Sequence, residues 1–138
     1  MEKLSKEIKE NIIKTLDKSS ARFAVLFGSA ASGRMVKTSD IDIAVFLDPA
    51  KNKSERFDEQ CEISGRLDGV GGRKIDVVCL NDVRSIPLKF SIIKEGDLLL
   101  ERDEKSRLDF EFRTMTDYYN FSAFISEYNR AYVQRILQ

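Results

Sequence analysis

Hydrophobic positions along the chain follow two different spacings, and each spacing predicts a different kind of element. Apolar residues three or four positions apart, with charged residues between them, indicate amphipathic helices. This spacing occurs over residues 3–18, 53–68, 85–94 and about 104–136, the last of which is either one long helix or two stacked ones. Short apolar runs rich in strand formers and bounded by turn residues predict strands. These runs are residues 22–27, 41–47, 74–80 and 97–102, the last either a strand or an extended segment.

The order of these elements predicts the fold class. Helix, strand, strand, helix, strand, helix, strand and helix follow one another, which is typical of an α/β or α+β domain with a small mixed sheet and flanking helices. A chain of 138 residues suits one compact domain with a helical appendage. We therefore expect one domain over residues 1–103 and a C-terminal helical extension over residues 104–138.

Composition and charge exclude several classes of function. Lysine and arginine together number 23, as do aspartate and glutamate, so the chain lacks the basic excess of proteins that bind extended nucleic acid. Histidine is absent, which excludes Ser-His-Asp and Cys-His catalysis and most transition-metal sites. No apolar run reaches membrane-spanning length, and the charged N-terminus lacks the apolar core of a signal peptide. We expect a cytoplasmic protein.

Three aspartates stand out against this background. Asp40 and Asp42 lie at the start of the second predicted strand, where residues two apart point to the same face. Asp76 lies inside the apolar run KIDVVCL, where a charge is costly unless it is paired or bound to a metal. If the two strands are neighbours, the three carboxylates converge. Adjacent negative charges repel each other, and oxygen ligands favour Mg²⁺ or Mn²⁺ as the ion that neutralises them.

A plainer interpretation of the aspartates stays open. They are then surface charges, or ion-pair partners of Arg34, Arg73 and Lys74. The loop before Asp40 favours chemistry instead. Gly28 and Ser29 directly follow a predicted buried strand, and glycine there allows the backbone to approach a ligand closely enough to bind phosphate oxygens. The loop fits neither the Walker A pattern nor the dinucleotide-binding G-x-G-x-x-G pattern.

The loop and the aspartates together form a longer pattern. Ten residues separate Ser29 from Asp40, giving G-S-x10-D-x-D in the string GSAASGRMVKTSDIDIAVFL, with KIDVVCL downstream. This combination resembles the signature of the polymerase-β-like nucleotidyltransferase superfamily. With RFAVLFGS before and IIKEGDLLLERD after, residues 20–103 look like its minimal nucleotidyltransferase (MNT) family. Family members often carry arginine where this chain has Ser32, so either Arg34 replaces it or the phosphate contacts are weaker.

The resemblance implies a polymerase-β-like nucleotidyltransferase fold and a role for each matching residue. Asp40 and Asp42 would ligate the Mg²⁺ ion that grips the triphosphate. Asp42 and Asp76 would help to bind a second Mg²⁺ ion and would orient or activate the acceptor hydroxyl. Such a site works by positioning and electrostatics and needs no histidine base. The nucleotide-binding residues implied for ATP are Gly28, Ser29, Arg34 and Ser39.

The C-terminal extension is rich in aromatic residues. Eight of the 13 aromatic residues lie after residue 109, including all four tyrosines. Part of this helix has to pack on its own sheet, but tyrosine and arginine are enriched at interfaces, so we expect a partner surface here. Such a tail resembles the antitoxin members of the MNT family, which pair with HEPN-domain ribonuclease toxins. That resemblance implies transfer of AMP from ATP to a tyrosine of the toxin.

Two other functions remain open. The chain is alternatively a binding module that neutralises a partner by burying its active site, with vestigial carboxylates. A third hypothesis is a transferase for a small acceptor such as an aminoglycoside, although such enzymes usually add a larger acceptor-binding domain. A nucleic-acid polymerase fits least well with the small size and neutral charge. The sequence leaves open whether the chain forms a homo-oligomer or a hetero-oligomer.

Overall fold

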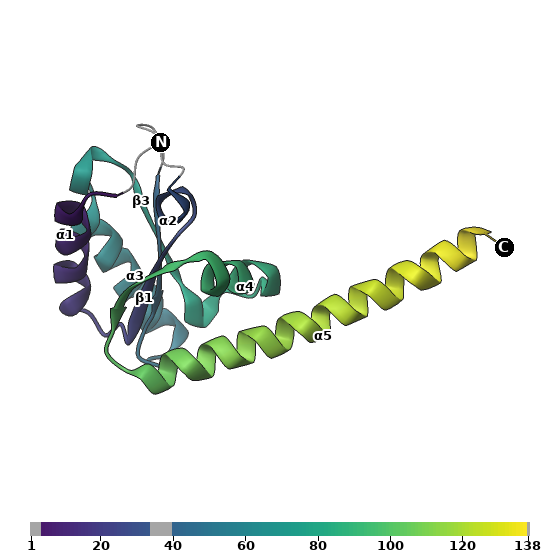
Figure 1. Cartoon of the computed structure of the whole chain (residues 1–138). Coiled ribbons are helices and arrows are strands. Elements are labelled where there is room, and N and C mark those ends of the chain that lie inside the picture. Colours follow the sequence, from purple (N-terminus) through teal and green to yellow (C-terminus); the bar gives the residue numbers. More distant parts are fainter. Residues whose placement is uncertain (1–3, 34–39, 138) are drawn as a thin grey trace.

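The strands form one mixed sheet, which the computed structural model describes together with the rest of residues 4–33 and 40–137. The strands are β1 (Phe23–Phe27), β2 (Ile41–Phe46), β3 (Ile75–Cys79) and β4 (Asp97–Glu101). They stand in the order β3-β2-β1-β4 (Figure 1). β1 pairs antiparallel with both β2 and β4, whereas β2 and β3 run parallel. The predicted strands and the small mixed sheet are therefore confirmed.

Capping residues in the sequence define where the helices begin. The helices are α1 (Lys6–Asp17), α2 (Ser29–Ser32), α3 (Lys53–Leu67), α4 (Ile86–Glu95) and α5 (Glu104–Leu137), with 3-10 turns η1 (Val70–Gly72) and η2 (Leu80–Asp82). Ser5 and Ser85 each accept a backbone N–H at the first turn of α1 and α4. Asn52 and Glu55 form a reciprocal capping box at the start of α3.

The main hydrophobic core lies between one face of the sheet and the helices α1 and α3 (Figure 1). Ile41, Ile43 and Val45 alternate along β2 and all point into this core, as the sequence pattern predicts. The helices contribute buried side chains at helical spacing, among them Ile12, Leu16, Ile63 and Leu67. Each fully buried side chain of this size stabilises the fold by about 1.5–3 kcal/mol.

The opposite face of the sheet is covered by a second, smaller cluster. It contains Phe23, Val25 and Ala44 of the sheet, Leu80 of η2 and Ile92 of α4. Figure 1 places α4 and α5 on this side of the sheet. This face is also the one that carries Asp42, because Asp42 and Ala44 are two residues apart on β2.

α5 is a single helix of 34 residues, which decides between the two arrangements left open by the sequence. Its beginning is tied to the domain, since Arg22 pairs with Asp103 at 2.9 Å and the Phe90 ring of α4 stacks on Tyr118 with 3.7 Å between centroids. Residues 119–137 are all exposed, and Figure 1 shows this half of α5 projecting away from the domain. No helix in the described residues is both long and apolar enough to cross a membrane.

Candidate active site

The strand register brings two of the three aspartates side by side. Asp42 of β2 is the register partner of Asp76 in the parallel β3, and on its other side it lies opposite Phe27 of β1. Asp40 directly precedes β2 and is exposed. The prediction that the strand carrying Asp76 is a neighbour of the strand carrying Asp42 is therefore confirmed. Asp42 and Asp76 share one face of the sheet and lie near the N-terminal ends of β2 and β3.

β1 ends in a turn at Gly28, and this turn lies next to the carboxylate of Asp42. Gly28 has a φ of 72°, in the left-handed region, and it precedes Ser29, the first residue of α2. A Cβ atom at Gly28 would lie 2.5 Å from the Asp42 Oδ2 atom, which is too close for a real contact. Glycine alone satisfies both the backbone dihedral and the available space. The backbone of the Gly28 turn and the aspartates therefore line one continuous surface.

The Asp42 carboxylate carries an unfavourable negative charge. Burial raises the pKa of Asp42 above its ordinary value of 3.8, and the negative charges of Asp76 and Asp40 raise this pKa further. Lys74 supplies a loose positive charge, because its Nζ atom lies 3.8 Å from the Asp76 Oδ1 atom. A cation placed between the aspartates would favour the ionised form of Asp42.

The donor atoms suit a hard divalent cation. Carboxylate oxygens are the ligands that Mg²⁺ prefers, and like charges at this distance are what a bound cation neutralises. Within the described residues, no three Asp, Glu, Cys or His side chains are arranged to hold an ion as they stand. Asp40, Asp42 and Asp76 fit Mg²⁺ in their chemistry, and their side chains would have to turn toward the ion to bind it.

The other residues implied by the resemblance have different outcomes. Gly28 and Ser29 lie at the turn beside Asp42, whereas Arg34 and Ser39 lie outside the described residues. Lys74 is a neighbour of the aspartates that the sequence pattern did not single out as a site residue. The sequence feature that could have identified Lys74 is the alternation in Lys74-Ile75-Asp76, which places the lysine and the aspartate on the same face of β3.

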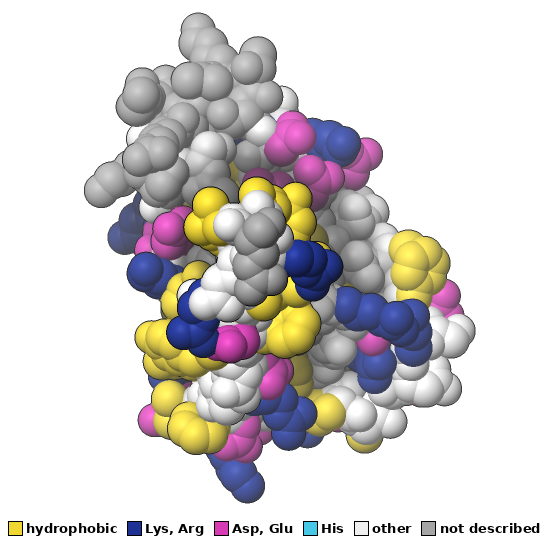
Figure 2. All heavy atoms as spheres, turned by 90° about the vertical axis from the view of Figure 1, so that its right-hand side faces the viewer, with side chains coloured by type: hydrophobic (Ala, Val, Ile, Leu, Met, Phe, Trp, Pro, Cys, Tyr) yellow, Lys and Arg dark blue, Asp and Glu magenta, His cyan; other side chains and the backbone are white. Residues whose placement is uncertain are grey.

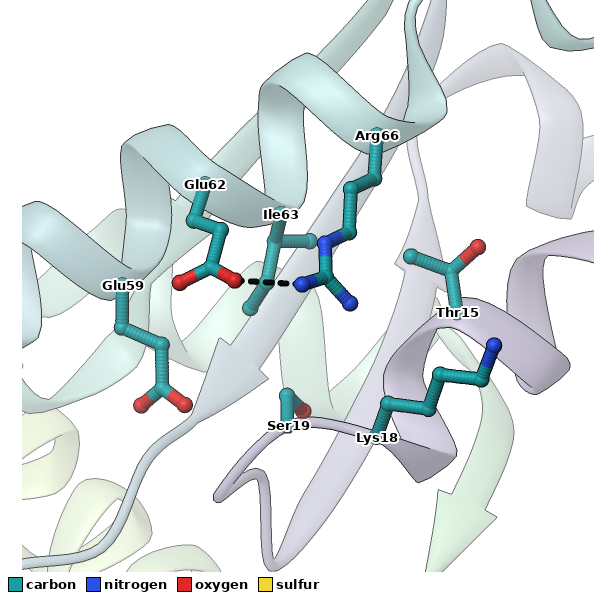
Figure 3. Close-up of a pocket in the computed structure, with 7 residues that line it drawn as sticks. All are labelled: Thr15, Lys18, Ser19, Glu59, Glu62, Ile63 and Arg66. Carbon is teal, nitrogen blue, oxygen red and sulfur yellow. Dashed lines mark hydrogen bonds and ion pairs between the residues drawn. The ribbon is translucent and has the colours of Figure 1, made fainter.

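A small recess on the other side of the molecule is unrelated to the aspartates. Figure 3 shows it between α1 and α3, lined by Thr15, Lys18, Ser19, Glu59, Glu62, Ile63 and Arg66. Its volume is about 40 Å³, and both of its glutamates already have cationic partners. Glu62 pairs with Arg66 at 2.6 Å, and Glu59 pairs with Lys51 at 3.2 Å. Since α1 and α3 cover the face of the sheet opposite Asp42, this recess does not belong to the carboxylate site.

Replacing Gly28 with alanine should displace the Asp42 carboxylate. Gly69→Ala is the matched control, because Gly69 also has a positive φ, of 81°, but a Cβ atom added there would have no other group within 4 Å. We expect the control to lose about 1–2 kcal/mol of unfolding free energy through backbone strain alone. Gly28→Ala should lose roughly a further 0.5–1.5 kcal/mol, because the Asp42 carboxylate ends a side chain that has to rotate away from the added methyl group. Urea unfolding measures both, and equal losses would contradict a direct contact between Gly28 and Asp42.

The raised pKa of Asp42 predicts how stability depends on pH. Because the folded pKa lies above the unfolded one, ionised Asp42 destabilises the fold, and this loss develops as the pH rises through the folded pKa. Asp42→Asn removes the loss, so it should raise the melting temperature near neutral pH in EDTA. Well below pH 3.8 the two proteins should melt alike apart from any pH-independent effect of the amide.

The same variant tests the cation. MgCl₂ should raise the melting temperature of the parent near neutral pH and should raise that of Asp42→Asn much less. Asp58→Asn, at an exposed position of α3, should respond to pH and Mg²⁺ as the parent does. An equal response of the parent and Asp42→Asn to Mg²⁺ would remove Asp42 from the cation site.

The sequence is similar to known transferases over most of its length. Residues 10–105 match the family described as "Polymerase beta, Nucleotidyltransferase". Two proteins of Methanocaldococcus jannaschii, each named "Putative protein adenylyltransferase", are 35% identical to the chain. One is matched over 83 residues, which are 60% of this chain and 79% of that protein. The other is matched over 90 residues, which are 65% of this chain and 91% of that protein.

The fold is similar to chains of known toxin–antitoxin structures. A chain in the crystal structure of the toxin-antitoxin with AMP-PNP matches with a TM-score of 0.71 and 23% identity, over 94% of this chain and 98% of that chain. A chain in the structure of the tri-AMPylated Shewanella oneidensis HEPN toxin in complex with MNT antitoxin matches with a TM-score of 0.64 and 21% identity, over 98% and 100%. At these identities the likeness shows the fold. Together with the sequence match, it establishes that the chain belongs to the polymerase beta nucleotidyltransferase family.

Proposed function

We propose that this chain is a Mg²⁺-dependent enzyme that transfers AMP from ATP to a protein. The acceptor in this proposal is a tyrosine of a cognate HEPN ribonuclease toxin, so the chain acts as an antitoxin. The observation that carries the proposal is the pairing of Asp42 with Asp76 beside the Gly28 turn. This arrangement occurs in a chain whose relatives are named as protein adenylyltransferases.

Each residue of the site has a role in this proposal. Asp40 and Asp42 would hold the Mg²⁺ ion that binds the triphosphate, and Asp42 and Asp76 would hold a second Mg²⁺ ion. The backbone at Gly28 and the hydroxyl of Ser29 bind the β- and γ-phosphates. Bound Mg²⁺ ions would stabilise the negative charge on the attacking and leaving oxygens. Arg34 and Ser39 complete the proposed nucleotide-binding set.

Of the two aspartates paired across β2 and β3, Asp76 is the better placed to meet the acceptor. Its side chain is 43% exposed, whereas Asp42 is partly buried between β1 and β3. In the transfer, the acceptor oxygen forms a bond to the α-phosphorus while the bond to the bridging oxygen breaks. Pyrophosphate leaves, and the hydroxyl proton passes to the Asp76 carboxylate and from there to solvent. The absence of histidine suits this reaction, because positioning and charge supply most of the rate enhancement in phosphoryl transfer.

The projecting half of α5 is the proposed partner-binding surface. Most of its large apolar residues share one side of the helix at helical spacing, and we call these the aromatic stripe: Phe121, Phe124, Ile125, Tyr128, Tyr132 and Ile136. Phe124 is 66% exposed and Tyr128 is 60% exposed. Figure 2 looks along α5 from its free end and shows hydrophobic side chains gathered around the helix. A contiguous apolar patch of several hundred Å² marks an interaction site.

The proposal divides the chain into two functional parts. In the proposal, residues 1–103 bind ATP and Mg²⁺, and residues 104–138 bind the toxin. The aromatic stripe also favours the second candidate function, in which the chain neutralises its partner by binding alone. A small-molecule acceptor is less favoured, because the exposed aromatic stripe offers an extended helix surface that suits a protein.

Transfer of labelled AMP tests the proposed reaction. The protein is mixed with MgCl₂, ATP labelled at the α-phosphate and a candidate HEPN-domain partner, and mass spectrometry locates AMP on the partner. Asp42→Ala should lower the transfer rate by at least about a hundredfold, because it removes a charge that both ions need. Asp58→Ala, on the exposed side of α3, should transfer at the parental rate. Tight binding without transfer by the parent would favour the binding-only function.

Changing the aromatic stripe should weaken partner binding while leaving the nucleotide site intact. We expect Phe124→Asp to weaken the partner Kd by about 2 kcal/mol, or roughly thirtyfold, by placing a charge in an apolar contact. Ala123→Asp is the control, because Ala123 is exposed on the other side of the same helical turn. Calorimetric titration gives both Kd values. Equal effects of the two variants would exclude the aromatic stripe as the contact surface.

A further inference from the structure

Lys74 lies beside the aspartates but outside the sequence signature that identifies them. The backbone fixes its position, because the N–H of Ile41 donates a hydrogen bond of 2.9 Å to the Lys74 carbonyl. Ile41 and Ile75, the next residues of the two strands, are register partners, so Lys74 lies level with Asp40. Alternation along β3 then places the side chains of Lys74 and Asp76 on the same face. The lysine is thus built into the strand pair that carries the site.

The ammonium group of Lys74 is only loosely held. Its Nζ atom is 3.8 Å from the Asp76 Oδ1 atom, and the lysine side chain is 73% exposed. Pairs of this kind contribute little to stability, so releasing the ammonium costs little. By contrast, Arg56 binds Asp82 through two nitrogen atoms at 2.7 and 3.0 Å. Arg56 therefore serves the fold, whereas Lys74 keeps a positive charge available at the site.

We propose that Lys74 is a triphosphate-binding residue whose ammonium group moves from Asp76 to a phosphate oxygen when nucleotide and Mg²⁺ bind. This inference rests on the proposed function. Three carboxylates and a triphosphate carry more negative charge than two divalent ions supply, so a further cation is favoured there. With Mg²⁺ bound beside it, Asp76 would attract the Lys74 ammonium less strongly than it does in the free protein. A flexible lysine acts as a point charge and is well suited to phosphate.

The inference predicts that removing the Lys74 charge weakens the binding of nucleotide but not the binding of Mg²⁺ alone. Lys74→Ala should weaken binding of AMP-PNP in the presence of MgCl₂ by roughly tenfold, because one phosphate contact is lost. The same variant should bind Mg²⁺ alone as tightly as the parent or more tightly, because the competing ammonium is gone. A purely structural role would not separate the two. Lys74→Arg, which keeps the charge, should bind AMP-PNP within about threefold of the parent.

Calorimetric titration of the full chain with MgCl₂, and then with AMP-PNP in excess MgCl₂, measures both effects. Lys14→Ala is the matched control, because Lys14 is an exposed lysine of α1, on the far side of the sheet. Parental AMP-PNP affinity in Lys74→Ala would overturn the inference and leave the proposed function standing. Equal weakening of Mg²⁺ and AMP-PNP binding, with a lowered melting temperature, would also overturn it. Failure of the parent to bind AMP-PNP would reject the nucleotide site itself.

Discussion

Two aspartates that repel each other are held in register on neighbouring strands, and the hydrophobic pattern prevents them from moving apart. Ile41 and Ile43 flank Asp42, and Ile75 and Val77 flank Asp76, and all four apolar residues are buried in the main core. A shift of one residue along either strand would bury an aspartate and expose its neighbours. The fold therefore maintains both the burial and the repulsion that raise the pKa of Asp42. A site strained in this way gains stability when a cation binds.

The two faces of the sheet have different roles. α1 and α3 pack on one face and form the main hydrophobic core with it, and this core stabilises the domain. On the other face, the Phe110 ring of α5 lies against Phe23 and Phe46, with centroids 5.8 and 5.7 Å apart. Phe46 is four residues beyond Asp42 on the same face of β2. One short strand thus carries both a candidate catalytic carboxylate and the anchor of α5, so the direction of the helix is fixed relative to the site.

The sequence predicts the elements well because their signals are local. Capping residues, glycine turns and apolar spacing all act within a few residues, and the i, i+2 spacing of Asp40 and Asp42 is equally local. The pairing of Asp42 with Asp76 depends on which strands are neighbours, and nothing in the spacing of β2 and β3 along the chain specifies that. The alternation in Lys74-Ile75-Asp76 places Lys74 beside Asp76, whereas its place level with Asp40 depends on the same strand pairing. Periodicity also predicts an apolar face on α5 without revealing whether the chain itself covers that face.

If this chain modifies a protein, the exposed half of α5 would determine which protein is the acceptor. The aspartates and the Gly28 turn would bind phosphate and metal, and none of them distinguishes one acceptor side chain from another. A partner bound to the aromatic stripe is tethered to the molecule that carries the site, because α5 is anchored by Phe110 on the face that carries Asp42. Such tethering raises the effective concentration of a nearby hydroxyl without any contact to the acceptor itself. On the proposed function, the choice of acceptor is therefore made by the long helix, and the sheet supplies the chemistry.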